Sequence, residues 1–281
     1  MPSKERIDVL LVQQGHFPSR EKAKAAIMAG LVYLGEERID KAGTKVSTQA
    51  TPTVKGSEHP YVGRGGLKME KAIQYFGLDV TDQRVIDIGA STGGFTDCVL
   101  KHGASFVYAV DVGYNQLAWS LRSDSRVAVM ERTNFRYIKR DDLPGELPEL
   151  AMIDVSFISL RLILPPLKDV LVKGGSVIAL IKPQFEAGRD QVGKAGIVRD
   201  PQVHQVVLQQ VISFAATIGF ALRGLTYSPV QGGEGNTEFL SWFTYEPAGI
   251  EEQLSEKPLS DDDDERIRFV VQEAHDHFNI R

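Results

Sequence analysis

Two charged residues end apolar segments of the chain and could support proton transfer. Asp154 follows the apolar residues 150–153, and Lys182 follows the apolar residues 177–181. We expect both segments to be buried parallel strands, which would bring both side chains to the carboxyl edge where open α/β sheets bind ligands. A charged side chain in such a place is either paired in a salt bridge or functional. A lysine there serves as a general base only if burial and a neighbouring cation lower its pKa from about 10.4 towards about 7–8.

A glycine-rich turn with the sequence G-A-S-T-G-G-F begins at Gly89, between an expected strand and an expected helix. Glycines allow the backbone to approach a ligand, and a helix start offers free N–H donors. The G-x-x-x-G-G spacing is not the dinucleotide G-x-G-x-x-G pattern, and no Gly-Lys-Ser/Thr follows, which argues against a P-loop. Asp111 ends the next expected strand, where a carboxylate can accept hydrogen bonds from ribose hydroxyls. The pattern indicates a nucleoside-binding cleft; the alternative is a tight turn with no ligand.

Strands and helices alternate from residue 64 onward. Strands are expected at residues 84–89, 106–111, 127–130, 150–155, 175–182, 220–227 and 237–245. Helices are expected at residues 66–76, 95–102, 160–172 and 201–218, with Pro165 and Pro166 kinking or breaking the third. This alternation predicts an α/β fold with a mostly parallel, doubly wound sheet of seven strands.

The first 50 residues have a different pattern. Apolar positions such as Ile7 and Leu10 predict a helix, and Ser19 is a good N-cap for a second helix at residues 20–29. A strand is expected at residues 31–34, and the segment after residue 50 is rich in Pro, Gly, Ser and Thr, as linkers are. We therefore predict a small α+β domain at 1–50, a linker at 51–63, the main domain at 64–246, and an acidic stretch with a terminal helix at 247–281.

Charge is distributed unevenly along the chain. The 281 residues include 32 Lys and Arg and 37 Asp and Glu, for a net charge of −5. Residues 1–71 nevertheless contain 12 basic and 8 acidic residues, whereas residues 251–265 contain 1 basic and 8 acidic residues. The basic N-terminal quarter favours a phosphate-bearing partner, because local potential matters more than net charge. We interpret the acidic run at 260–265 as a solvated segment that leads into a helix at 266–278.

Composition excludes several classes of protein. Cys98 is the only cysteine, so a disulfide framework and a cysteine-based zinc site are excluded, and a reducing cytoplasm is the expected location. No apolar run reaches about 18 residues, so neither a spanning helix nor a membrane partner is expected. Charged residues near Met1 argue against a signal peptide, and the six histidines lack metal-ligand spacing, so no metal site is expected.

The turn and its surroundings carry a family resemblance. The segment D-I-G-A-S-T-G-G-F-T-D resembles the TlyA family, which comprises RNA 2′-O-methyltransferases of the FtsJ/RrmJ-like class historically called hemolysins. The N-terminal segments R-I-D-V-L-L and S-R-E-K-A-K-A-A-I-M-A-G-L-V resemble an S4-type RNA-binding domain. The resemblance extends to about residue 246. It implies a Rossmann-like methyltransferase domain with a seven-stranded sheet, S-adenosylmethionine as cofactor, and ribosomal RNA or ribosomal subunits as partners.

The resemblance also implies which residues form the sites. The residues expected to bind the cofactor are Asp87, Gly89, Ala90, Ser91, Thr92, Gly93, Gly94, Phe95, Asp111 and Asn134. The residues expected to bind RNA phosphates, which supply affinity without sequence readout, are Arg6, Arg20, Lys22, Lys24 and Arg64.

A Lys-Asp-Lys-Glu tetrad is implied at Lys68, Asp154, Lys182 and Glu238. Lys68 and Glu238 come from the resemblance alone, and Lys71, one helical turn further on, is an alternative for the first position. A ribose hydroxyl is a poor nucleophile at neutral pH, so its methylation requires in-line positioning and removal of its proton. We hypothesise that Lys182 is the general base, that Asp154 and Lys68 orient and tune it, and that Glu238 is an electrostatic support.

The implied substrate is a cytidine 2′-hydroxyl in ribosomal RNA of one or both subunits. A base amino-methyltransferase is an alternative, but its Asp/Asn-Pro-Pro-aromatic motif has only a partial counterpart in the segment D-V-S-F that begins at Asp154. A second alternative is a non-catalytic RNA-binding or ribosome-assembly factor. A pore-forming hemolysin is a third, although the sequence contains no long series of alternating amphipathic strands.

Overall fold

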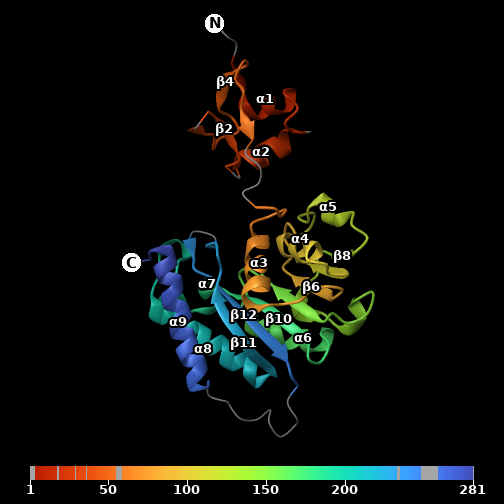
Figure 1. Cartoon of the computed structure of the whole chain (residues 1–281), viewed down its shortest axis with the longest axis vertical. Coiled ribbons are helices and arrows are strands. Elements are labelled where there is room, and N and C mark those ends of the chain that lie inside the picture. Colours follow the sequence, from red (N-terminus) through yellow and green to blue (C-terminus); the bar gives the residue numbers. More distant parts are fainter. Residues whose placement is uncertain are drawn as a thin grey trace. The chain divides into compact units, whose positions relative to one another are not determined.

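The structure is a computed structural model that describes residues 4–17, 19–28, 30–35, 37–54, 59–232, 235–247 and 259–280. It divides into two compact units, Met1–Pro60 and Tyr61–Arg281 (Figure 1). The boundary falls inside the segment 51–63 that the sequence indicates as a linker. Part of that segment, residues 55–58, lies outside the described residues, as do residues 248–258 of the predicted C-terminal region.

The N-terminal unit packs two helices against short antiparallel strands. Its elements are β1 (Lys4–Arg6), α1 (Ile7–Gln13), α2 (Arg20–Met28), β2 (Val32–Leu34), β3 (Glu37–Arg38), β4 (Lys45–Ser47) and β5 (Thr53–Val54). Strand β1 pairs with β4, and β2 lies between β3 and β5. Both predicted helices and the strand at 31–34 are confirmed, and Ser19 Oγ accepts a hydrogen bond from the Lys22 amide. Strand β5 shows that the predicted linker begins with a paired segment.

A buried carboxylate organises the surface of this unit. Asp8 is 0% exposed, yet it accepts hydrogen bonds from Arg6 Nε at 2.9 Å and from an Arg20 terminal nitrogen at 2.9 Å. The hydrogen bond from Arg6 is the strongest of the effects that lower the pKa of Asp8 to about 2. Both arginine side chains are nearly half exposed, so each guanidinium is held by Asp8 on one edge and faces solvent on the other.

The C-terminal unit is built on one twisted sheet. Within the described residues, its seven strands are β6 (Arg84–Ile88), β7 (Phe106–Val110), β8 (Val127–Met130), β9 (Leu150–Ile153), β10 (Ser176–Ile181), β11 (Phe220–Tyr227) and β12 (Phe239–Tyr245). Their order is β11-β12-β10-β9-β6-β7-β8, and β12 runs antiparallel to both of its neighbours while the other pairs are parallel. The predicted α/β fold with a mostly parallel, seven-stranded sheet is confirmed.

Helices cover both faces of this sheet. They are α3 (Gly65–Phe76), α4 (Gly94–Lys101), α5 (Trp119–Arg122), α6 (Leu164–Val170), α7 (Pro183–Glu186), α8 (Pro201–Thr217) and α9 (Asp261–Phe278). Residues of α3, α4 and α5 pack in one apolar cluster with alternate strand residues such as Val85 and Ile178. The intervening strand residues, such as Ile86, pack with α6, α8 and α9 in a second cluster. No helix of the described residues is long and apolar enough to span a membrane.

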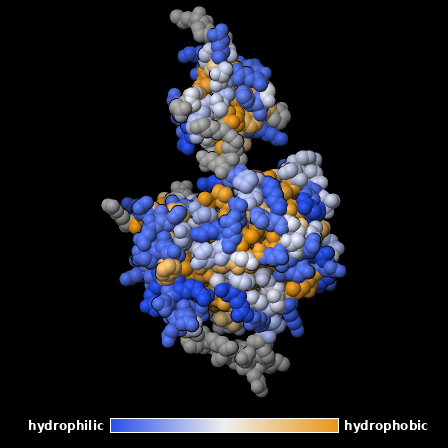
Figure 2. Space-filling model, viewed as in Figure 1, coloured by the Kyte–Doolittle hydropathy of each residue, from blue (hydrophilic) through white to orange (hydrophobic). Residues whose placement is uncertain are grey.

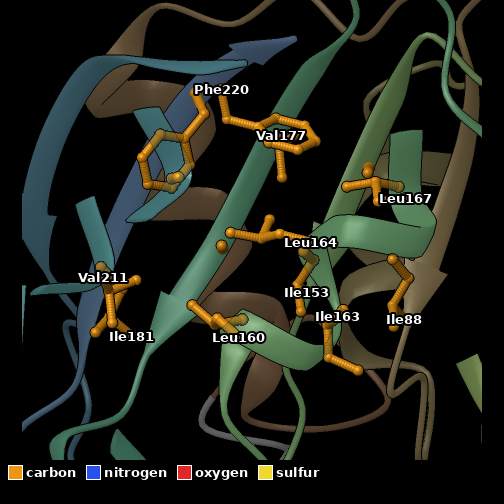
Figure 3. Packing of buried hydrophobic residues seen from close by; sticks show 14 of the residues in the cluster. Ile88, Ile153, Leu160, Ile163, Leu164, Leu167, Val177, Ile181, Val211 and Phe220 are labelled. Atoms are coloured by element: carbon orange, nitrogen blue, oxygen red, sulfur yellow. The ribbon is translucent and has the colours of Figure 1, made fainter. Parts of the chain in front are cut away.

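The second cluster shows why the strand sequences are apolar throughout. Figure 3 shows Ile88, Ile153 and Val177 from neighbouring strands meeting leucines from the segment that follows β9. Residues between them point to the other helical layer, so both sets of alternating positions must be apolar. The face of the molecule in Figure 2 is instead mostly hydrophilic.

Two predicted helices differ from the observed ones at their starts. The predicted helix 160–172 is a 3₁₀ turn, Leu160–Leu162, followed by α6, and Pro165 and Pro166 lie in the first turn of α6. They do not kink the helix, because the first-turn amides have no intrahelical acceptor to lose. The terminal helix α9 begins at Asp261 rather than at residue 266. Ser260 Oγ caps it by accepting a hydrogen bond from the Asp263 amide, and the acidic run forms its first turn.

Replacing Asp8 by asparagine should destabilise the N-terminal unit by about 1–2 kcal/mol at neutral pH, because the half-exposed arginines lose their shared carboxylate. The pKa of Asp8 is lowered from 3.8 to about 2, so this stabilisation is present above pH 4 and is lost as the pH falls towards 2. Hydrogen exchange of the α1 and α2 amides measures the effect. Asp40→Asn is the control, because Asp40 pairs with Arg38 in full contact with solvent; equal effects of both changes would contradict the interpretation.

Candidate active site

Four charged side chains meet at the carboxyl edge of the sheet. Lys182 Nζ lies 2.5 Å from Asp154 Oδ1, and Lys68 Nζ lies 3.5 Å from Asp154 Oδ2. Lys68 Nζ also donates to Glu238 Oε2 at 2.6 Å. The two lysines therefore converge on opposite oxygens of one carboxylate, and a second carboxylate binds Lys68.

The sheet topology explains why these residues meet. Strands β9 and β10 are parallel neighbours, so Asp154 and Lys182, each the first residue after its strand, lie side by side. Strand β12 runs in the opposite direction and pairs Phe239 with Ile181, which places Glu238 next to Lys182 in the sheet. Helix α3 supplies Lys68 from the layer above. The structure thus brings together all four residues that the resemblance implies.

Burial and charge act against each other in this cluster. The side chains of Lys68, Lys182 and Glu238 are at most 10% exposed, and that of Asp154 is 19% exposed. Burial by itself lowers the pKa of Lys68, but Asp154 and Glu238 together raise it above the usual lysine value. Burial likewise raises the pKa of Asp154, and the two ammonium groups more than reverse that effect. Lys68 is therefore a fixed positive charge on the far side of Asp154 from Lys182.

Lys71, the alternative to Lys68, lies elsewhere. Its ammonium group is 3.4 Å from the centre of the Tyr227 ring and forms none of the ion pairs of the cluster. Burial lowers the pKa of Lys71 to about 8. The structure therefore favours Lys68 for the first position.

The glycine-rich turn is shaped by close backbone contacts. Gly89 has φ +88°, and a Cβ there would lie 2.5 Å from the carbonyl oxygen of Asp154. A Cβ on Gly94 would lie 2.8 Å from the amide nitrogen of Gly66 in α3. Gly93 has φ +94°, and a Cβ on it would collide with Leu121. Gly93 faces the apolar layer rather than a cavity, so its predicted contact with the cofactor is replaced by a packing role.

Two aspartates hold the turn in place. Asp111 Oδ2 accepts a hydrogen bond from the Ser91 amide at 2.8 Å, and Oδ1 accepts one from the Gly113 amide at 2.6 Å. Asp87 is buried below the turn and accepts hydrogen bonds from the amide and the hydroxyl of Thr96. Burial raises the pKa of Asp87 to about 7. Asp87 thus fastens the start of α4 to the end of β6, a role for which Thr96 is the partner that sequence analysis missed.

Two cavities open on either side of the turn. One, of about 440 Å³, is lined by Asp111, Asn134 and the apolar side chains of Val112 and Phe135. The other, of about 620 Å³, is lined by the four charged residues, by Arg64, and by the predicted cofactor residues Asp87, Ala90, Thr92, Gly94 and Phe95. Gly89, Ser91, Asp154, Ser156 and Phe157 line both. A carboxylate and an amide beside apolar walls suit a nucleoside, and the adjoining cavity leaves room for a second molecule at Lys182.

The cavity walls contain functional candidates that sequence analysis missed. Phe157 is 90% exposed with φ +63°, and its ring lies 5.0 Å from that of Phe185. Ser156 Oγ accepts a hydrogen bond from Lys182 Nζ at 3.3 Å, and Gln184 donates one to Glu238 at 3.4 Å. The available signal was position, because Phe157 and Phe185 each lie three residues after a charged residue that ends a strand.

The predicted RNA-binding residues differ in how free they are. Arg6 and Arg20 are engaged by Asp8, whereas Lys22 is exposed and Lys24 is half-buried on α2. Arg64 belongs to the other unit, where it directly precedes α3 and lines the larger cavity.

The fold and site define an α/β enzyme of the Rossmann-like methyltransferase class, with a nucleoside cleft and a Lys-Asp-Lys-Glu cluster at one sheet edge. The model of the FtsJ-like methyltransferase family matches residues 61–245, and that of the S4 domain matches residues 5–51. The chain belongs to the FtsJ-like methyltransferase family and carries an S4 domain at its N-terminus.

Individual relatives support this assignment over nearly the whole chain. The chain is 58% identical to the "Putative rRNA methyltransferase YqxC" of Bacillus subtilis, over 97% of this chain and 94% of that protein. It is 40% identical to the "16S/23S rRNA (cytidine-2'-O)-methyltransferase TlyA" of Mycobacterium tuberculosis, over 93% and 96%. A solved structure, "Putative hemolysin from Streptococcus thermophilus", is 52% identical with a TM-score of 0.76, over 99% and 98%.

Replacing Asp154 by asparagine should lower the pKa of Lys68, because Asp154 contributes to raising it. The shift is measured by an NMR titration of ¹³C-labelled lysine side chains, with the Lys68 signal assigned from a Lys68→Arg protein. Asp142→Asn, at an exposed acid remote from the cluster, should leave the titration unchanged. An unchanged Lys68 signal in Asp154→Asn would contradict the electrostatic coupling described above.

Proposed function

We propose that this protein is an S-adenosylmethionine-dependent methyltransferase that acts on the 2′-hydroxyl of cytidine in ribosomal RNA, with Lys182 as general base. The observation that carries the proposal is the pair of buried lysines on opposite oxygens of Asp154. They stand beside a cavity that adjoins a nucleoside-type cleft. A base amino group needs no such base, because its nitrogen is already a nucleophile.

The smaller cavity fits S-adenosylmethionine by the chemistry of its lining. Asp111 and Asn134 offer hydrogen-bond partners to ribose hydroxyls and adenine, and Val112 and Phe135 offer apolar walls to the base. The glycine-rich turn lies between this cavity and the lysines. When bound, the cofactor supplies an electrophilic methyl group on a positively charged sulfur. The neutralisation of that charge during transfer favours a water-poor pocket.

The residues around Lys182 can move and hold the proton of the ribose hydroxyl. A neutral Lys182 Nζ accepts that proton as the O2′–methyl bond forms, which leaves an ammonium group beside Asp154. Asp154 and Ser156 fix the direction of Nζ, and Lys68 keeps Asp154 ionised. Glu238 in turn holds Lys68. The protonated product state is thus stabilised by an existing carboxylate without rearrangement.

The choice of RNA rests on the S4 domain and on the relatives. The Mycobacterium tuberculosis relative is named for both 16S and 23S rRNA and for cytidine, and it aligns with both units of this chain. Lys22 and Lys24 place positive charge on α2, and the exposed Phe157 offers a surface on which a nucleobase can stack. Since ribosomal RNA is the proposed substrate, we place the reaction in the cytoplasm.

Replacing Lys182 by alanine should reduce methyl transfer by about 10²–10⁴-fold, the range for loss of a general base, while S-adenosylmethionine affinity stays unchanged. The assay is transfer of a labelled methyl group to ribosomal subunits, followed by mapping of the modified nucleotide. Lys71→Ala is the matched control at a buried lysine outside the cluster. Wild-type rates for Lys182→Ala would eliminate the mechanism, and a methyl group on the base would favour an amino-methyltransferase instead.

Replacing Lys22 and Lys24 by glutamine should weaken RNA binding and reduce the magnitude of its salt dependence by about two, one per phosphate contact. These lysines are chosen because Arg20 also holds Asp8, so changing Arg20 would mix folding with binding. Filter binding of ribosomal RNA at several salt concentrations provides the measurement. Cofactor affinity should not change; a parallel loss of cofactor affinity would show that the effect is not confined to RNA contacts.

A further inference from the structure

One wall of the larger cavity is an irregular loop that the mechanism above does not use. The loop joins α7 to α8 over residues 187–200 and consists of short turns without pairing to the sheet. Ala195 and Gly196 line the cavity, and both have positive φ, +62° and +72°. A non-glycine residue in this conformation persists only where its surroundings hold it. The surroundings of this loop are therefore informative.

Asn236 binds the loop through both ends of its side chain. Its Oδ1 accepts a hydrogen bond from the Val198 amide at 3.1 Å, and its Nδ2 donates to the Gly196 carbonyl at 3.0 Å. Asn236 is 3% exposed and lies two residues before Glu238, so the segment that carries a tetrad residue also carries this clamp. A buried side chain that satisfies one donor and one acceptor of a loop fixes both its distance and its orientation.

A second set of hydrogen bonds approaches Val198 from the opposite side. His204 of α8 places Nε2 3.1 Å from the Val198 carbonyl, and its Nδ1 lies 3.0 Å from Nε2 of His275 in α9. A carbonyl only accepts, so His204 must donate from Nε2, and its Nδ1 must then accept from His275. This direction requires a neutral His204, and burial lowers the pKa of His204 to about 4. The terminal helix is thus connected through two imidazoles to a cavity wall.

We propose that Asn236 and His204 are positioning residues that hold residues 194–198 as the wall against which the target nucleotide of the RNA is placed. The proposal rests on the function proposed above. The wall belongs to the cavity of Lys182, and the cavity assigned to the cofactor contains none of its residues. Loosening the wall therefore raises the KM for RNA, while cofactor affinity and the rate at saturating RNA change little.

Matched substitutions separate this role from general packing. His204→Gln retains a donor that reaches the Val198 carbonyl, whereas His204→Phe retains a ring but has no donor. Asn236→Asp retains the acceptor for Val198 and loses the donor to Gly196. Gln202→Ala, at an exposed position of α8, is the control.

The wall is probed directly by trypsin cleavage after Lys194, followed by mass spectrometry of the full-length protein. We expect about tenfold faster cleavage for His204→Phe and Asn236→Asp, and rates within about twofold of wild type for His204→Gln and Gln202→Ala. The KM for ribosomal RNA should follow the same order, with cofactor affinity constant.

Unchanged cleavage in both loosened variants would overturn the anchoring role, and faster cleavage with an unchanged KM for RNA would overturn the role in substrate placement. A wild-type protein that methylates no ribosomal RNA would instead refute the proposed function, and the cleavage rates would still decide whether the anchors exist. Asn236→Asp keeps the test decisive if His204→Phe does not fold.

Discussion

The carboxylate of Asp154 is the interaction on which the site depends. Two ammonium groups at most 10% exposed would each lose hydration and repel the other, a cost that only nearby negative charge offsets. Asp154 binds both lysines, and Glu238 binds Lys68 from the other side. The cluster therefore contains as many acidic as basic groups, and a proton that moves to or from Lys182 changes a balance already set by three fixed neighbours.

Close approach of backbones brings the four groups together. Gly66 of α3 and Gly94 of α4 lie so near each other that a Cβ on Gly94 would meet the Gly66 amide. This contact fixes α3 above the glycine-rich turn and sets the position of Lys68 two residues later. Gly89 approaches the Asp154 carbonyl in the same way. The glycines thus have two roles, since they open space for a nucleoside and they bring the catalytic elements into contact.

Elsewhere in the molecule, buried polar side chains hold loops that apolar packing cannot hold. Asp8 orients two surface arginines, Asp87 fastens a strand to the helix that follows it, and Asn236 holds a cavity wall. Each is almost fully buried and satisfied by specific partners, so its hydrogen bonds set a geometry as well as a stability. The surfaces that a nucleic acid would meet are in this way arranged from beneath by groups that it does not touch.

The sequence by itself determined the strands and helices of the main unit, because apolar runs and glycine stops are local signals. It also determined that Asp154 and Lys182 share an edge, since both end parallel strands. Lys68 and Glu238 came only from a family resemblance: they lie 170 residues apart, and no local pattern encodes their distance. Strands of two or three residues, such as β3 and β5, were missed because they are too short for periodicity. Only the tertiary structure decided that Asn236, His204 and His275 form one line of hydrogen bonds, because such contacts depend on how distant elements pack.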